Sequence, residues 1–265
     1  SVENQYRESD EALASFGEHD EVVLWFEHDL YDQLVLIRHL DFFSKQELNR
    51  TRLSLICIGE FPGRDSFHGL GELTPEQLYS LFPSRHPITS GQLELGRRAW
   101  AAFTATDPGD LDNLASEDTR PLPFLASALR RFLEEYPSSF NGLGRTEQQI
   151  LSLLYEGGKS PAELFVSTYK LEEAIFMGDS TFWGRVKALG TGAWPLVTLD
   201  VVETPDRYPQ GQVKITDLGL EVLEGRNDWV ELNGIDRWFG GVHLQGSSAA
   251  WRWDKKTSRL RAYGG

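Results

Sequence analysis

The clearest change in the hydrophobic pattern lies within Val22–Phe43, VVLWFEHDLYDQLVLIRHLDFF. Val22–Phe26 is apolar throughout, which is typical of a parallel strand that is covered on both faces. Apolar residues then recur near helical spacing over Leu30–Phe43, so we expect a helix with Asp29 as its N-cap. A second apolar run, Arg52–Ile58, predicts another buried strand. The order strand, helix, strand predicts a right-handed parallel crossover.

A glycine-rich segment, Glu60–Leu73, follows the second predicted strand and leads into a capping-box sequence that starts at Thr74. A loop of this kind at a helix N-terminus can cradle an anion. The glycine spacing matches neither the dinucleotide-binding motif nor the P-loop, so the pattern favours an ordinary long loop. Prolines then separate four predicted helices: Thr74–Phe82, Ser90–Phe103, Pro108–Ala115 and Leu122–Tyr136.

The pattern changes at Arg145, and Pro137–Gly144 before it is the best linker candidate. Three amphipathic helices come first, of which the third is capped by Asp179 or Ser180. Two strands around a turn-rich segment and a short helix follow, which is the order of a winged-helix domain. The predicted elements are Thr146–Tyr155, a helix from Ser160, Thr181–Leu189, Trp194–Val202, Gln212–Thr216 and Asp217–Glu224.

The last segment, residues 227–265, is rich in tryptophan. Here Phe239–Gln245 and Ala250–Asp254 predict two short strands joined by a turn at Gly246. The whole pattern predicts an α/β fold in three parts. These are a small, Rossmann-like parallel sheet with a helical region over residues 1–140, a winged-helix-like α+β domain over residues 141–226, and a C-terminal β-hairpin segment over residues 227–265.

The charge of the chain bears on which partners it can bind, and its cysteine content bears on its cellular compartment. The chain carries 26 Lys and Arg against 40 Asp and Glu, a net charge of −14 that repels a phosphate backbone. The tail Trp251–Gly265 is basic, and we interpret it as a solvated hairpin. The single cysteine, Cys57, lies in an apolar run, which fits an inert thiol in a reducing compartment. We find no secretory signal and no apolar run near the roughly 20 residues of a membrane helix, and we expect a cytoplasmic protein.

The first candidate site is the turn Glu27-His28-Asp29, because ligands of open α/β sheets bind at the carboxyl ends of the strands. Alternation along the strand places Glu27 and Asp29 on one side and His28 on the other. Two neighbouring carboxylates can separate into an acid and a base, and a histidine can add a base or a metal ligand. In the alternative interpretation Asp29 only caps the helix, Glu27 pairs with an arginine, and His28 is a surface residue.

A second candidate set, for ligand binding, is Asn233, Asp236, Arg237 and His243, which lie among aromatic residues and glycines. Arg237 is suited to clamp a carboxylate or a phosphate. The favoured alternative is a hairpin in which Asp236 and Arg237 form a structural pair.

The third candidate is the winged helix, whose third helix would present Arg185 and Lys187 to nucleic acid. Residues 141–226 hold eight Lys and Arg against twelve Asp and Glu. That balance favours a structural or protein-contacting winged helix over a DNA reader.

The sequence assigns no metal ligands and names no cofactor. His19, His39, His68 and His86 show no metal-ligand spacing. The motifs GxSxG, HExxH, CxxC and the P-loop are all absent, which excludes the hydrolases and zinc sites built on them.

The LWFEHDLYDQ segment and its companions resemble an uncharacterised bacterial family of domain-of-unknown-function proteins. The resemblance extends over nearly the whole chain, but it implies no activity, because the family has none assigned. The segments that carry it are Glu21–Leu40, Leu53–Gly59, Gly69–Leu81, Leu122–Tyr136, Asn141–Thr146, Phe176–Trp183 and Asn233–Leu244.

Members of that family carry additional N-terminal sequence with a first strand and helix, an Asn-Gly-Asp segment and a Trp-Arg-Asp segment, and residues 1–20 here do not match them. Two predicted strands are also fewer than a parallel sheet usually has. We therefore expect a truncated chain, or a sheet completed by the tail hairpin, by a partner chain or by a second copy.

Three functional hypotheses follow, and none of them names a substrate or a reaction. In the first, the chain is an enzyme or a small-molecule-binding protein whose pocket surrounds Glu27 and Asp29, with His28 as an auxiliary group and Arg237 or His243 reaching in. In the second, it is a nucleic-acid-binding regulator. In the third, it is a protein-interaction module whose winged helix docks a partner.

Overall fold

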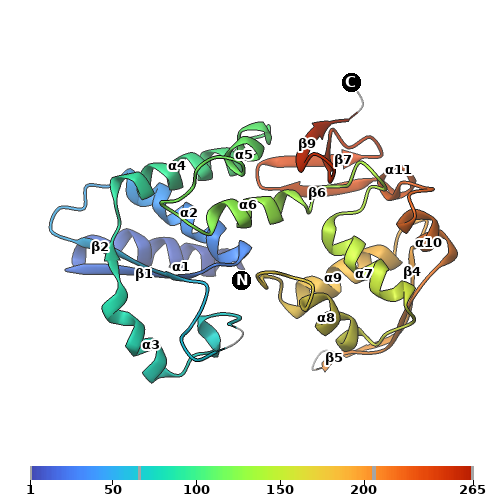
Figure 1. Cartoon of the computed structure of the whole chain (residues 1–265), viewed down its shortest axis with the longest axis horizontal. Helices are drawn as coiled ribbons and strands as arrows, with labels where there is room; N and C mark the ends of the chain where they lie inside the picture. The colour runs from blue at the N-terminus through green and yellow to red at the C-terminus, as the bar shows by residue number, and fades with distance from the viewer. Residues whose placement is uncertain (1, 65–66, 205–206, 264–265) are drawn as a thin grey trace. The chain divides into compact units, whose positions relative to one another are not determined.

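The computed structural model describes residues 2–64, 67–204 and 207–263, with side chains from residue 7 onward (Figure 1). The chain forms two compact units. The first unit comprises residues 1–101 and 118–128, and the second comprises residues 102–117 and 129–265. The division predicted at residue 140 thus falls inside the second unit, which also holds residues 227–265 together with residues 141–226.

The first unit contains a three-stranded sheet in the order β1-β2-β3. The strands β1 (Glu21–Glu27) and β2 (Arg52–Ile58) pair in parallel, and α2 (Leu30–Ser44) connects them. This confirms the predicted parallel pair. The sheet is mixed rather than wholly parallel, because the short strand β3 (His86–Pro87) pairs antiparallel to β2.

The core of the first unit lies between the sheet and α2. Leu36, Ile37 and Leu40 on the helix are fully buried, and Leu24 and Phe26 on β1 and the continuous run of residues 53–56 on β2 are buried as well. Glycine permits a close helix contact here, since a Cβ at Gly96 would lie 2.3 Å from the Cβ of Leu40. The other elements of this unit are α1 (Val2–Ala14), α3 (Pro75–Leu81), the start of α4 (Ser90–Thr104) and the 3-10 helices Ser15–Glu18, Leu70–Glu72 and Phe82–Ser84.

The second unit begins with three helices, α5 (Gly109–Leu114), most of α6 (Leu125–Leu133) and α7 (Arg145–Tyr155). Then follow α8 (Pro161–Tyr169), α9 (Asp179–Gly190), the antiparallel pair β4 (Val197–Thr204) and β5 (Arg207–Ile215), α10 (Asp217–Leu223) and α11 (Trp229–Asn233). An isolated antiparallel bridge also joins Lys159 to Val213.

One apolar core unites α7 to α10 with the β4–β5 pair. Its buried members include Leu151, Leu164, Phe182, Trp183 and Val213. The amphipathic spacing of the three predicted helices therefore identified the faces that pack together.

Two hairpins end the chain, where the sequence pattern predicted one. The strands β6 (Ile235–Phe239) and β7 (Val242–Gly246) pair with each other, as do β8 (Trp251–Asp254) and β9 (Arg259–Ala262). The prediction of a single strand over Phe239–Gln245 was wrong. Gly240 adopts a φ of +60°, a left-handed conformation that turns the chain between β6 and β7.

The predicted linker Pro137–Gly144 is also wrong, because its second half is part of the core. Asn141 is fully buried and Leu143 is 1 % exposed. The Asn141 side-chain amide donates to Gln148 Oε1 at 2.8 Å and to the carbonyl of Val222 at 3.0 Å. The polar side chain of Asn141 therefore forms hydrogen bonds inside the protein and is not exposed to solvent.

Two local predictions in the second unit need correction. Gly178 is the N-cap of α9, and neither Asp179 nor Ser180 caps it, since both are already helical. The segment predicted as a turn-rich loop at residues 203–211 is largely strand, because β4 and β5 extend into it. In the part of the chain that the structure describes, none of the helices combines the length and apolar character needed to cross a membrane.

Candidate functional site

Three carboxylates lie together where β1 ends and α2 begins. They belong to Glu27, Asp29 and Asp32, and one oxygen of each lies within 4.8 Å of the others. Glu27 is the last residue of β1, Asp29 is the N-cap of α2, and Asp32 lies in the first turn of that helix. We call these three side chains the carboxylate cluster.

Backbone amides fix the orientation of the two aspartates. Asp29 Oδ1 accepts from the amides of Tyr31 at 2.7 Å and Asp32 at 3.1 Å, which is the geometry of a helix cap. Asp32 Oδ2 accepts from the amide of Glu27 at 2.9 Å and so closes the turn between strand and helix. The alternative in which Asp29 caps the helix is thus confirmed, and the same cap holds its carboxylate inside the cluster.

The glycine-rich segment closes over Glu27. The amide of Leu70 donates to Glu27 Oε1 at 2.5 Å. Gly69 adopts a φ of +146°, and a Cβ there would lie 2.3 Å from Glu27 Oε2. Only glycine leaves room for this approach. The anion that this segment holds is therefore the protein's own Glu27 carboxylate. Glu27 pairs with a backbone amide and not with an arginine, as the alternative interpretation had it.

Burial raises the pKa of every member of the cluster, and repulsion between carboxylates adds to this at Glu27 and Asp32. Loss of hydration is the largest cause for Glu27, partly offset by the Leu70 amide and then reinforced by the charges of Asp32 and Asp29. Desolvation likewise raises the pKa of Asp29 and, together with the Asp29 charge, that of Asp32. Across the described residues no arginine or lysine forms an ion pair with any of the three.

His28 lies apart from the cluster, as the strand alternation predicts. Its ring stands between Phe67, at 6.4 Å between ring centroids, and Phe124, at 5.9 Å. Burial lowers the pKa of His28, which favours the neutral imidazole. Its Nδ1 is buried and accepts no hydrogen bond from any residue that the structure describes. His28 is therefore a half-buried neutral histidine with a free ring nitrogen, rather than a surface residue.

Asp32 is the member of the cluster that the sequence analysis did not single out as a site residue. Its signal was present in the sequence, because residues three apart at a helix start face the same side. Behind the cluster, the buried Gln33 amide donates to the carbonyl of Glu27 at 2.6 Å. Burial raises the pKa of the neighbouring Cys57 thiol to about 11, which agrees with the prediction of an inert thiol.

Comparison with known proteins adds no function. No family model and no curated protein matches the chain. The resemblance to the uncharacterised bacterial family therefore stays a prediction, and the geometry of the site carries the functional argument.

The structure does not bring the four residues of the second candidate set into one site. Arg237 donates to Glu147 Oε1 at 2.9 Å, so it does clamp a carboxylate, but one of the protein's own. Asp236 pairs with His243 at 2.6 Å and not with Arg237. The Asn233 amide bonds both backbone groups of Trp194, which gives it a structural role.

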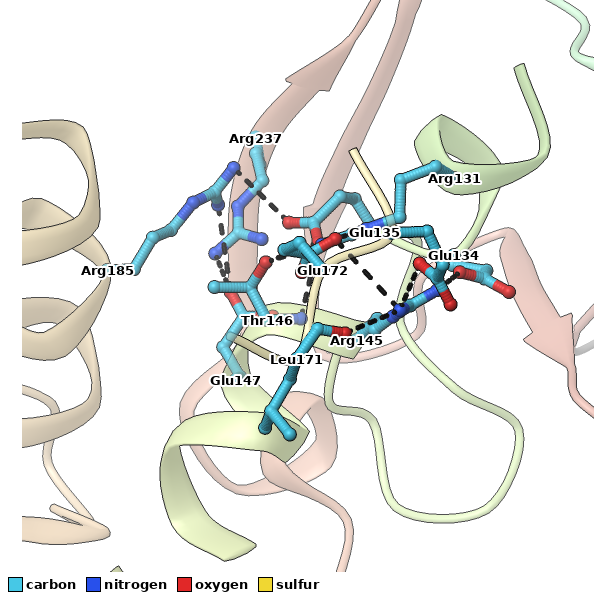
Figure 2. A network of polar contacts seen from close by, with 11 residues as sticks. Arg131, Glu134, Glu135, Arg145, Thr146, Glu147, Leu171, Glu172, Arg185 and Arg237 are labelled. Carbon is cyan, nitrogen blue, oxygen red and sulfur yellow. Dashed lines mark hydrogen bonds and ion pairs between the residues drawn. The ribbon is translucent and has the colours of Figure 1, made fainter. Parts of the chain in front are cut away.

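Arg237 belongs to a buried polar network of the second unit (Figure 2). Arg131 forms its centre, donating to Glu135 at 2.8 Å and, through two nitrogens, to Glu172 at 2.7 and 2.9 Å. Thr146 also donates to Glu135, at 2.6 Å. The arginines hold the pKa of Glu135 down at about 2 despite its burial. Such a network fixes how α6, α7 and the segment before α9 pack.

Both basic residues predicted for nucleic-acid contact are paired within the protein. Arg185 lies 3.8 Å from Glu135 and 3.7 Å from Glu147, beside the same network (Figure 2). Lys187 pairs with Glu203 at 3.2 Å. Arg185 thus faces buried carboxylates, whereas Lys187 forms a surface ion pair, which is a weak interaction.

Proposed function

We propose that the chain binds a small molecule through a divalent cation held by Glu27, Asp29 and Asp32. The observation that carries this proposal is the approach of three carboxylates to within 4.8 Å, combined with the lack of a described basic ion-pair partner for any of them. A bound cation would balance the negative charge of these three carboxylates.

The chemistry of the donors suits a hard cation. Magnesium, manganese and calcium prefer carboxylate oxygens, and one or two carboxylates with several waters suffice for magnesium. Backbone amides already orient all three side chains, so the donors need little reorganisation when a cation binds. Each carboxylate also keeps lone pairs beyond those its amides use.

A cation held in this way would present open positions to an anionic ligand such as a phosphate or a carboxylate. It would polarise that ligand as a Lewis acid. The substrate stays open. The raised pKa values of the three carboxyl groups agree with a functional site at this strand end.

The Rossmann-like assignment of the first unit belongs to this proposal. The parallel β1–α2–β2 arrangement supports it, because the cluster lies outside the carboxyl end of a parallel strand, where such sheets bind ligands. Within the described sheet β1 is an edge strand, and we propose that a further strand, from this protein or from a partner, pairs there.

Thermal melting with and without magnesium, manganese or calcium chloride tests the proposal. We expect these salts to raise the melting temperature of the wild type, and to have little effect on Glu27→Gln and Asp32→Asn. Glu60→Gln is the matched control, because Glu60 is exposed just after β2 and its substitution removes the same charge. Equal shifts in all four proteins, or none in the wild type, would contradict it.

For the second unit we propose a winged helix that contacts protein rather than nucleic acid. The bridge between Lys159 and Val213 supports the fold, because it supplies the short strand that winged helices have between their first two helices, and β4–β5 form the wing. The paired states of Arg185 and Lys187 favour the protein-contacting function. Fluorescence anisotropy with a labelled DNA duplex tests this. Salt-sensitive binding that is lost in Arg185→Ala would favour the nucleic-acid regulator instead.

A further inference from the structure

The exposed face of the β6–β7 hairpin carries a flat aromatic surface. Trp238 and His243 are directly opposite each other in the register of this pair. Their rings stack with centroids 4.4 Å apart and planes 2° from parallel. Trp238 is nevertheless 65 % exposed, whereas Trp229 and Trp253 in the same segment are buried at 7 % and 6 %. This indole is thus held in one orientation and open to a partner.

Polar groups stand beside this surface on the same face. Asp236 and Gln245 form the next opposing pair two residues along, and both are exposed. Asp236 Oδ1 lies 2.6 Å from His243 Nε2, and this contact holds the imidazole against the indole. We call Asp236, Trp238 and His243 the hairpin platform. The neighbouring Arg237 points elsewhere, because its guanidinium bonds Glu147.

The hairpin is rigid behind the platform. Phe239, Val242 and Leu244 on the opposite face are all at most 5 % exposed. The turn is anchored as well, since the amide of Gly241 donates to the carbonyl of Phe103 at 2.9 Å. A platform that is already ordered loses little entropy when a partner binds.

We infer that the hairpin platform binds an arginine side chain presented by a protein partner. A guanidinium is planar, stacks on an indole face and forms forked hydrogen bonds with a carboxylate, so Trp238 and Asp236 together match its two recognition features. The charge also agrees, because the chain has a net charge of −14 and β6 and β7 hold no basic residue besides Arg237 and His243. A phosphate-bearing partner would meet Asp236 instead. This inference does not depend on the carboxylate cluster.

Titration with hexa-arginine and hexa-lysine peptides tests the inference. We expect the wild type to bind hexa-arginine more tightly than hexa-lysine, and Trp238→Ala to weaken hexa-arginine binding roughly fivefold. Asp236→Asn should weaken it as well. Trp194→Ala is the matched control, because Trp194 is also exposed, at 54 %, and its loss should leave the affinity unchanged. Unchanged melting temperatures would show that the variants are folded.

Three results would overturn the inference. The first is equal affinity of wild type and Trp238→Ala for hexa-arginine, and the second is an equal loss in Trp194→Ala. The third is binding of an oligosaccharide such as maltohexaose that Trp238→Ala abolishes while hexa-arginine binding stays unchanged, because an exposed indole beside polar groups would then be a carbohydrate platform.

Discussion

The carboxylate of Asp32 accepts the backbone amide of Glu27 at 2.9 Å, so the end of β1 and the first turn of α2 are tied to each other. This hydrogen bond has a cost, because it holds a third carboxylate beside Glu27 and Asp29. A capped helix start needs only Asp29. The cation that we propose at this site would offset the repulsion that this third carboxylate brings.

Without divalent cations, the cluster should make stability depend on pH in a defined direction. The pKa values of Glu27, Asp29 and Asp32 are raised in the folded protein, so these groups bind protons at a higher pH when folded than when unfolded. Their contribution to stability is complete below the unfolded pKa values and is lost as the pH rises through the folded ones. Asp32→Asn should make this loss shallower and should stabilise the cation-free protein at neutral pH.

Urea denaturation in the presence of a chelator, from about pH 3.5 to about pH 7, measures this difference. The comparison is between Asp32→Asn and Glu60→Gln, since both remove one carboxylate near the ends of the two parallel strands. Identical pH profiles for the two variants would contradict the prediction, because the carboxylate of Asp32 would then cost the folded protein no more than an exposed one.

Gly69 should be intolerant of any side chain. Its φ is +146°, and a Cβ at this position would lie 2.3 Å from Glu27 Oε2, so alanine strains the backbone and displaces the carboxylate. We expect Gly69→Ala to lower the free energy of unfolding by about 1–3 kcal/mol. Gly71→Ala is the control, because a Cβ at Gly71 meets nothing within 4 Å. Equal stability of the two variants in urea would refute this account of the loop.

Arg237 should stabilise the second unit through Glu147, which is 1 % exposed. Arg237→Met removes the hydrogen-bonded arginine from a buried carboxylate, and we expect a loss of roughly 3 kcal/mol in the free energy of unfolding. Arg226→Met should change it by less than about 0.5 kcal/mol, because Arg226 pairs with Glu224 on the surface. If urea denaturation gives both variants the same small effect, Arg185 already suffices to balance Glu147.

Local patterns in the sequence predicted much of the first unit and part of its site. The apolar run, the helical spacing and the cap at Asp29 identified β1, α2 and the position of Glu27. Strand alternation also separated His28 from the two acids. These features depend on neighbours within a few residues, which is the range over which hydrophobic periodicity and capping act.

Contacts between distant segments could not be predicted in the same way. The amide of Leu70 that holds Glu27 is 43 residues away, and Glu147 is 90 residues from Arg237. Nothing in the local pattern of Gly69 distinguishes a glycine that faces a carboxylate from one in an open loop. The hairpin turn at Gly240 is a local feature that the prediction missed, because the apolar residues on both sides of the turn were taken as one strand.

Manganese binding tests the central claim most directly, because electron paramagnetic resonance counts free manganese without any knowledge of the substrate. We predict that the wild type and Glu60→Gln each bind one manganese ion, and that Asp32→Asn binds it at least about tenfold more weakly. Equal manganese affinity in Asp32→Asn and the wild type, or no binding by the wild type, would contradict the assignment of a cation to Glu27, Asp29 and Asp32.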